Sequence, residues 1–160
     1  MDLSSGLCLE DEDQPTDADV EALPHRLEAF NERQWPGHQL WQPLGVFVRD
    51  GRHRNIVAGL AGETYAGWLY VRYLRVSATL RGQEIGCELI DKAESRALER
   101  GCHSAWLDTF GFQAPGFYQT LGYEVFGELN WSADHKRVFL HKRLAQPAGH
   151  GGPSLSRTDH

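Results

Sequence analysis

The spacing of apolar side chains predicts a long amphipathic helix near the start of the chain. Its apolar members recur every three or four residues, at Val20, Leu23, Leu27 and Phe30. This period places them on one helical face. Thr16 is a suitable N-cap with acidic residues after it. Pro24 is expected to kink the helix or to split it in two.

A second apolar stripe, between residues 83 and 100, is the clearest periodic segment of the chain. Its apolar positions are Ile85, Leu89, Ile90, Ala93, Ala97 and Leu98. Gly101 follows as a stop signal. A shorter helix is expected to begin at Pro115 and to end at Leu121.

The remaining apolar segments predict strands on both sides of the second helix. They lie at residues 6–10, 44–49, 55–65, 67–76, 104–109, 123–129 and 136–144. A helix that joins two neighbouring strands is typical of a parallel crossover, so 67–76 and 104–109 should form a parallel pair. The predicted class is α/β, with a mixed, mostly antiparallel central sheet of about seven strands flanked by about four helices.

Length and composition favour a single globular domain, which we place at residues 1–144 of the 160-residue chain. The tail at 145–160 is rich in Gly, Pro, Ser and His and is expected to be disordered. Without a long apolar run or a signal-peptide pattern, we expect no membrane association and a cytoplasmic location. Because Cys8, Cys87 and Cys102 lack the spacing of a zinc site or a disulfide framework, no metal is expected.

The acidic residues are concentrated at the N-terminus. The first 40 residues hold ten acidic and two basic side chains, and the remainder has a net charge of +2. A nucleic-acid surface needs a clustered basic face, so no nucleic-acid partner is expected. The acidic segment is either a solvated helix face or, if it borders a substrate cleft, a feature that favours a cationic acceptor.

The junction between strand and helix at residues 74–90 has the character of a phosphate site. The strand breaks at Ser77, and a helix starts after a turn that contains Gly82 and Gly86. The free N–H groups and the dipole of a helix start attract anions. Neither GxxxxGK[ST] nor GxGxxG is present, so the hypothesis of a nucleoside triphosphate site loses its main support.

Two motifs together resemble the GNAT superfamily of acyl-CoA-dependent N-acetyltransferases. Residues 74–86 resemble its CoA-pyrophosphate motif, in which Arg or Gln is followed by x-x-Gly-x-Gly or Ala. Its second signature is matched by Ala114, Phe117, Tyr118, Leu121, Gly122 and Tyr123. The resemblance implies a parallel strand pair that splits at the acetyl-CoA site, acetyl-CoA as acyl donor and an amine acceptor.

The resemblance also implies which residues bind acetyl-CoA. They are Leu74, Val76, Arg81, Gly82, Gln83, Glu84, Ile85 and Gly86. The first two would pair with the pantetheine arm, and the amides of 81–86 would hold the pyrophosphate. Glu84 replaces the first motif glycine, and its charge weakens CoA binding unless it points to solvent. Gly111 stands where many members have a cofactor-binding Asn, so this contact is absent or is made by Gln113.

The resemblance makes Tyr118 the general acid. A phenol with a pKa of about 10 can protonate or hydrogen-bond a departing thiolate with a pKa of about 8.5. Relatives often place a Glu on the strand equivalent to 69–76, which here contains no acidic residue. The candidate general bases are therefore Asp108 and Glu63.

Aromatic residues in the segments expected to face the thioester suggest a pocket for a partly apolar or cationic amine, with Trp68, Tyr70 and Trp131 as substrate contacts. No Cys–His pair supports a covalent route. We therefore expect direct transfer from acetyl-CoA to a primary amine of a small molecule in a ternary complex. The alternatives are a protein lysine or N-terminal acetyltransferase, and an acyl-CoA-binding module with weak catalysis. A homodimer is compatible with the sequence.

Overall fold

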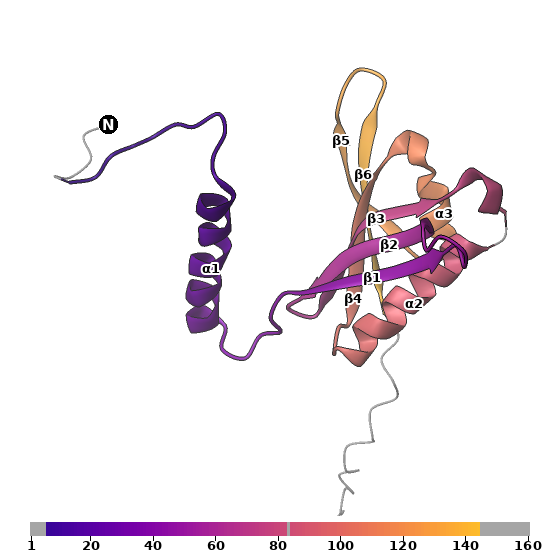
Figure 1. Ribbon diagram of the computed structural model, residues 1–160, viewed down its shortest axis with the longest axis horizontal. Coiled ribbons are helices and arrows are strands. Elements are labelled where there is room, and N and C mark those ends of the chain that lie inside the picture. The colour runs from indigo at the N-terminus through magenta and orange to yellow at the C-terminus, as the bar shows by residue number, and fades with distance from the viewer. Residues whose placement is uncertain (1–5, 83, 145–160) are drawn as a thin grey trace, which may run out of the picture. The chain divides into compact units, whose positions relative to one another are not determined.

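The computed structural model describes residues 6–82 and 84–144. Figure 1 shows the order of its helices and strands along the chain. Its contacts divide the chain into two compact units, Met1–His38 and Gln39–His160. The predicted tail at 145–160 lies outside the described residues.

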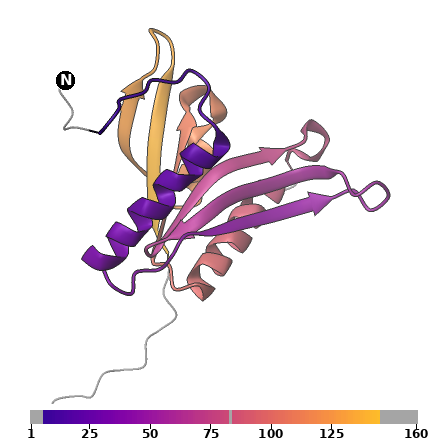
Figure 2. The ribbon, with the colours of Figure 1, turned by 60° about the vertical axis from the view of Figure 1, so that its left-hand side comes forward.

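The N-terminal unit is built on helix α1 (Asp17–Gln34). Thr16 is its N-cap, as predicted, and its side chain accepts a hydrogen bond from the Asp19 backbone N–H at 3.2 Å. The predicted division at Pro24 was wrong, because α1 runs through this residue as one helix, without a break in Figure 2. A proline removes one backbone hydrogen bond, and the bonds of the turns before and after it keep the helix continuous.

The strand predicted at residues 6–10 was also wrong, because 7–12 have no regular structure. Alternation of apolar and polar side chains indicates which face a strand would bury. A strand also needs a neighbour for its backbone N–H and C=O groups. This segment has no such neighbour within the described residues.

The C-terminal unit contains a six-stranded sheet in the order β1-β2-β3-β4-β6-β5. The strands are β1 (Gln42–Arg49), β2 (Ile56–Tyr65), β3 (Trp68–Val76), β4 (Ser104–Phe110), β5 (Glu124–Asn130) and β6 (Lys136–Arg143). The mixed, mostly antiparallel sheet with β3 and β4 as its parallel pair is confirmed. The described residues form six strands rather than about seven, since 6–10 is not one of them.

The described residues contain three α-helices rather than about four. Besides α1 these are α2 (Ile85–Glu99) and α3 (Pro115–Thr120), and two 3-10 turns lie at η1 (Ala78–Leu80) and η2 (Gly111–Gln113). Helix α2 lies along one face of the strands β1, β2 and β3 (Figure 2). It buries Leu89, Ile90, Ala93 and Ala97, and burial of an aliphatic side chain contributes about 1.5–3 kcal/mol.

A buried polar cluster also fixes α2 against the sheet. The Glu94 carboxylate accepts hydrogen bonds from Lys142 Nζ at 2.9 Å and from the Tyr123 hydroxyl at 3.0 Å. Each partner satisfies a polar group that would be costly to bury alone. The cluster and the aliphatic stripe together hold α2, and with it the first turn of this helix, in place against the sheet.

Candidate active site

The parallel pair β3 and β4 separates partway along its length. The two strands are paired only from Trp68 opposite Ser104 to Val71 opposite Leu107. Beyond this point β3 continues along β2, and β4 continues along β6. The backbone groups that β3 turns toward the gap therefore have no partner in β4.

A bulge in β3 explains why the strands separate here. In the pairing with β2, Val71 lies opposite Gly62 and Tyr73 lies opposite Ala61, so Arg72 is an extra residue. A bulge bends its strand and increases the local twist. The split that the resemblance implied is thus built into β3 directly after its last pair with β4.

A pocket of about 570 Å³ lies beside the second half of β3 and extends to the start of α2 and to α3. It brings together eight of the predicted cofactor residues, namely Leu74, Val76, Arg81, Gly82, Glu84, Ile85, Gly86 and Gln113. Gln83, which was predicted with them, lies outside the described residues. The pocket also contains Arg75, a second cation beside Arg81 that sequence reasoning missed.

The turn before α2 is held by two residues in the left-handed backbone region. Gly82 has a φ of 82° and Glu84, the N-cap of α2, has a φ of 57°. The Glu84 side chain is exposed and makes no capping hydrogen bond. The side chain therefore does not occupy the N–H groups of the first turn of α2, which remain available to an anion.

Gly86 has a packing role in this pocket. A Cβ atom at this position would lie 3.0 Å from Cζ of Phe117. The first turn of α2 and the helix α3 therefore approach each other more closely than a side chain at Gly86 would comfortably allow.

Tyr118 lines the pocket from α3 with its ring buried. Its hydroxyl makes no hydrogen bond among the described residues, which leave no fully buried polar side-chain atom without a partner. The hydroxyl is therefore not fully buried, and Tyr118 is one of the residues that line the pocket. Burial raises the pKa of Tyr118 above 10, so the phenol keeps its proton at neutral pH.

Gln113 lines the pocket and also stabilises the end of β4. Its Oε1 accepts a hydrogen bond from the Phe110 backbone N–H at 3.1 Å. The side chain therefore caps η2, in addition to the cofactor contact predicted for it.

The two candidate bases lie on the sheet face opposite α2, and both carboxylates are paired. Asp108 Oδ1 accepts a hydrogen bond of 2.8 Å from the Tyr70 hydroxyl, and Oδ2 forms an ion pair with Arg137. Glu63 forms an ion pair of 2.6 Å with Arg72. Burial, followed by the hydrogen bond to Asp108, raises the pKa of Tyr70 to about 12.

The structure brings together two of the three predicted substrate residues. Trp68 and Tyr70 line one cavity on the face opposite α2. Trp131 is exposed and lies instead beside Phe110, with ring centroids 6.0 Å apart, and beside Arg137.

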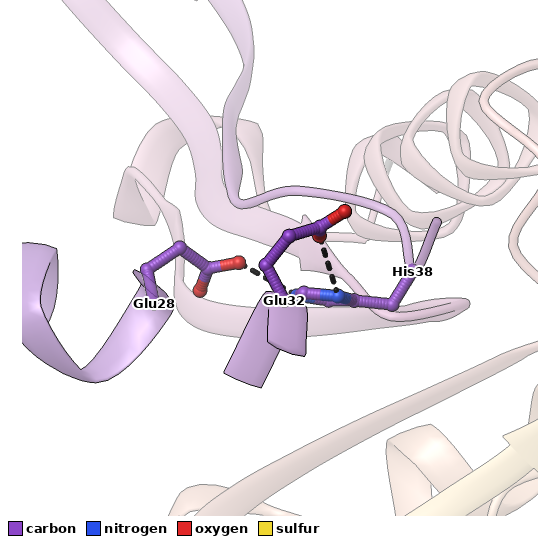
Figure 3. A group of neighbouring side chains, drawn as sticks. All are labelled: Glu28, Glu32 and His38. Carbon is purple, nitrogen blue, oxygen red and sulfur yellow. Dashed lines mark hydrogen bonds and ion pairs between the residues drawn. The ribbon is translucent and has the colours of Figure 1, made fainter. Parts of the chain in front are cut away.

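In the part of the chain that is described, Glu28, Glu32 and His38 form a group that could hold a metal ion, with ligand atoms within 4.8 Å of one another. Figure 3 shows His38 between the two carboxylates, with Nε2 2.6 Å from Glu28 and Nδ1 3.2 Å from Glu32. Nδ1 also lies 2.8 Å from the Trp35 carbonyl oxygen. These oxygen atoms suit an imidazolium, and they raise the pKa of His38 above 6.5, the Trp35 carbonyl most strongly.

The fold and the pocket beside the split sheet define an acyltransferase. The sequence profile of the acetyltransferase (GNAT) family matches residues 9–123, and the chain belongs to this family. Members of the family use acetyl-CoA as the acyl donor. No described helix is long and apolar enough to cross a membrane.

Two relatives and one crystal structure support this assignment. The chain is 43% identical to blasticidin-S acetyltransferase of Streptomyces morookaense over an alignment of 115 residues, with a coverage of 65% of this chain and 84% of the relative. It is 34% identical to an acetyltransferase of Agrobacterium fabrum over 80% of this chain and 93% of the relative. A crystal structure of a protein from Agrobacterium tumefaciens described as an acetyltransferase superposes with a TM-score of 0.78 at 30% identity, covering 86% of this chain and 99% of that one.

Proposed function

We propose that this protein transfers the acetyl group of acetyl-CoA directly to a primary amine of a small molecule in a ternary complex. One observation carries the proposal. Tyr118, whose hydroxyl has no hydrogen-bond partner among the described residues, lines a pocket that also contains the start of α2 and the unpaired edge of β3. An acid, an anion site and an unpaired strand edge are the three features that a CoA thioester requires.

Each part of the pocket has a separate task in this proposal. The β3 edge at Leu74 and Val76 pairs with the pantetheine arm, and the N–H groups of the first turn of α2 bind the pyrophosphate. Arg75 and Arg81 add positive charge to the pocket wall. Tyr118 gives its proton to the sulfur as the carbon–sulfur bond breaks and the new carbon–nitrogen bond forms.

We propose that the acceptor is an amino group of a small-molecule antibiotic. Blasticidin-S acetyltransferase is named for a small molecule, and the similarity to it covers most of its length. Blasticidin S is therefore the first acceptor to test.

The test combines the full-length protein with acetyl-CoA and a panel of amines that includes blasticidin S, a lysine peptide and a peptide with a free N-terminus. CoA release and the mass of the product are measured together. Acetylated blasticidin S or another small amine, with strong loss of turnover in Tyr118→Phe, supports the proposal. Acetyl-CoA binding without turnover on any amine would refute it in favour of a CoA-binding module.

A further inference from the structure

A cavity on the sheet face opposite α2 combines aromatic walls with a single negative charge. It has a volume of about 340 Å³, and its aromatic lining consists of Trp41, Tyr65, Trp68, Tyr70 and Trp106. Glu63 is the one charged residue among those that line it. Aromatic faces attract cations, and a carboxylate among them is a natural counter-ion.

The cavity lies next to the split in the sheet. Glu63 is directly opposite Tyr70 in the pairing of β2 with β3. Tyr70 reaches Asp108, the first β4 residue beyond the last parallel pair. A group bound against Glu63 is therefore one strand away from the position where β3 and β4 part.

The carboxylate of Glu63 is held by a partner that can leave. Its side chain is 16% exposed, whereas that of Arg72 is 47% exposed. Arg72 is the extra residue of the β3 bulge, and its guanidinium lies 5.1 Å from the Tyr70 ring centroid. The neighbouring strand β1 places uncharged Pro43 opposite Glu63.

Asp108 is held far more firmly. Its side chain is only 9% exposed, and its two oxygens bind residues from two different strands, Tyr70 of β3 and Arg137 of β6. Arg137 is itself packed over the Phe110 ring at 4.7 Å. Displacing Arg137 would expose this stack and leave Asp108 poorly compensated.

We propose that the aromatic cavity binds the cationic amine of the acceptor, and that Glu63 exchanges the Arg72 guanidinium for this ammonium group and then accepts its proton. One cation replaces another, so the carboxylate stays paired throughout. This inference rests on the proposed acetyl transfer. It makes Glu63 the base and leaves Asp108 to hold the two strands.

The protons balance in this scheme. Of the three protons on the ammonium nitrogen, one stays in the amide product and one leaves to solvent through Glu63. The third leaves the nitrogen as it attacks and returns to the Tyr118 phenolate, which has given its own proton to the sulfur.

The decisive experiment compares steady-state kinetics of Glu63→Gln and Arg72→Gln with wild type, using blasticidin S and n-butylamine as acceptors. Glu63→Gln should lower kcat/KM for the amine by about 100-fold or more, with little change in the dissociation constant of acetyl-CoA. Glu63→Asp should recover part of the activity. Glu128→Gln, which breaks the exposed Glu128–Lys136 pair, is the matched control.

Arg72→Gln should act in the opposite direction. Removing the competing guanidinium should lower the KM for the amine by about two- to fivefold, because the closed Glu63–Arg72 pair no longer opposes binding. A role of Arg72 confined to stability would not lower KM. If Glu63→Gln fails to fold, this variant decides the question.

The proposal is overturned if Glu63→Gln keeps kcat/KM within about threefold of wild type, or if Arg72→Gln leaves the KM unchanged or raises it. Failure of the wild-type protein to acetylate any amine would instead refute the proposed function. In that case, the fluorescence of the tryptophans that line the cavity still reports whether a cation binds there. The n-butylammonium ion should change it in the wild-type protein and not in Glu63→Gln.

Discussion

The Tyr70 hydroxyl donates a hydrogen bond of 2.8 Å to Asp108 Oδ1, and this bond joins β3 to β4 just beyond the last pair of their parallel ladder. The strands part here, so a side-chain bond takes over where the backbone bonds end. It fixes the width of the split at its narrow end.

We predict that Tyr70→Phe lowers the free energy of unfolding by about 1.5 kcal/mol, since it removes a hydrogen bond to a largely buried carboxylate. The phenylalanine ring can keep the stack on Trp106, whose centroid lies 4.1 Å from that of Tyr70. Urea denaturation measures the change as a shift of the midpoint with an unchanged slope. A midpoint equal to that of wild type would show that the bond does not stabilise the split.

The same residue gives a prediction at alkaline pH. The folded-state pKa of Tyr70, about 12, lies above its ordinary value of 10, so the folded protein holds this proton more tightly than the unfolded chain. The stabilisation is complete below pH 10 and is lost as the pH rises from 10 to 12. Stability measured across this window should fall less steeply in Tyr70→Phe than in wild type.

We predict that Glu84→Gly stabilises the protein slightly. The left-handed backbone at Glu84 costs a non-glycine residue about 1–2 kcal/mol, of which the added freedom of glycine in the unfolded chain takes back about 0.5–1 kcal/mol. The acetyl-CoA affinity should rise by no more than about threefold, because an exposed carboxylate is screened by water. Calorimetry measures the affinity, and thermal unfolding measures the stability.

Glu84→Asn is the matched control, because asparagine also lacks the charge and tolerates the left-handed conformation better than most residues. It separates the effect of the carboxylate from that of the backbone. A rise in affinity well above threefold in both variants would show that the carboxylate faces the pyrophosphate.

We predict that Tyr118→Phe lowers kcat by about 100-fold or more, as expected for loss of a general acid. Stability should change by less than about 0.5 kcal/mol, because the hydroxyl has no hydrogen-bond partner among the described residues. Since the pKa of Tyr118 lies above 10, the wild-type rate should not fall through loss of this proton below pH 10. A kcat close to wild type, or a loss of acetyl-CoA binding in the variant, would remove Tyr118 from this role.

We predict that the end of α1 is more stable in acid than in base. The folded-state pKa of His38 is raised above 6.5, so its contribution is complete below pH 6.5 and is lost as the pH rises through the folded-state value. Amide hydrogen exchange at the last turn of α1 should therefore speed up with rising pH by more than the base catalysis of exchange alone would produce.

NMR titration of the imidazole checks this prediction directly. Glu28→Gln removes a carboxylate 2.6 Å from Nε2, so it should lower the pKa of His38. A wild-type value at or below 6.5 would contradict the assignment. Addition of Zn²⁺ at neutral pH tests the metal alternative, since bound metal would stop the titration.

Much of the fold could be predicted from the sequence because its signals are local. The stripe of α2 and the stop at Gly101 predicted a helix within two residues of its observed bounds, and a helix between two strands implied the parallel pair. The strand predicted at residues 6–10 was wrong because side-chain alternation says nothing about whether a strand finds a neighbour. The predicted division of the helix at Pro24 was wrong because one missing hydrogen bond does not end a long helix.

The candidate site was harder to predict where it depends on pairing between distant residues. No sequence pattern marks Arg72 as an extra residue, yet this bulge opens the split and brings Arg72 to Glu63. The partners of Asp108 come from β3 and β6, which are far from it in sequence. Most of the residues predicted to bind acetyl-CoA line one pocket, because the two motifs lie within two short segments.

The missing side chain at Gly86 decides how two segments of the pocket wall fit together. A Cβ added there would lie 3.0 Å from Cζ of Phe117, and Tyr118 is the next residue of α3. Any larger residue at Gly86 would therefore have to displace the first turn of α2 or the Phe117 ring, and both line the pocket.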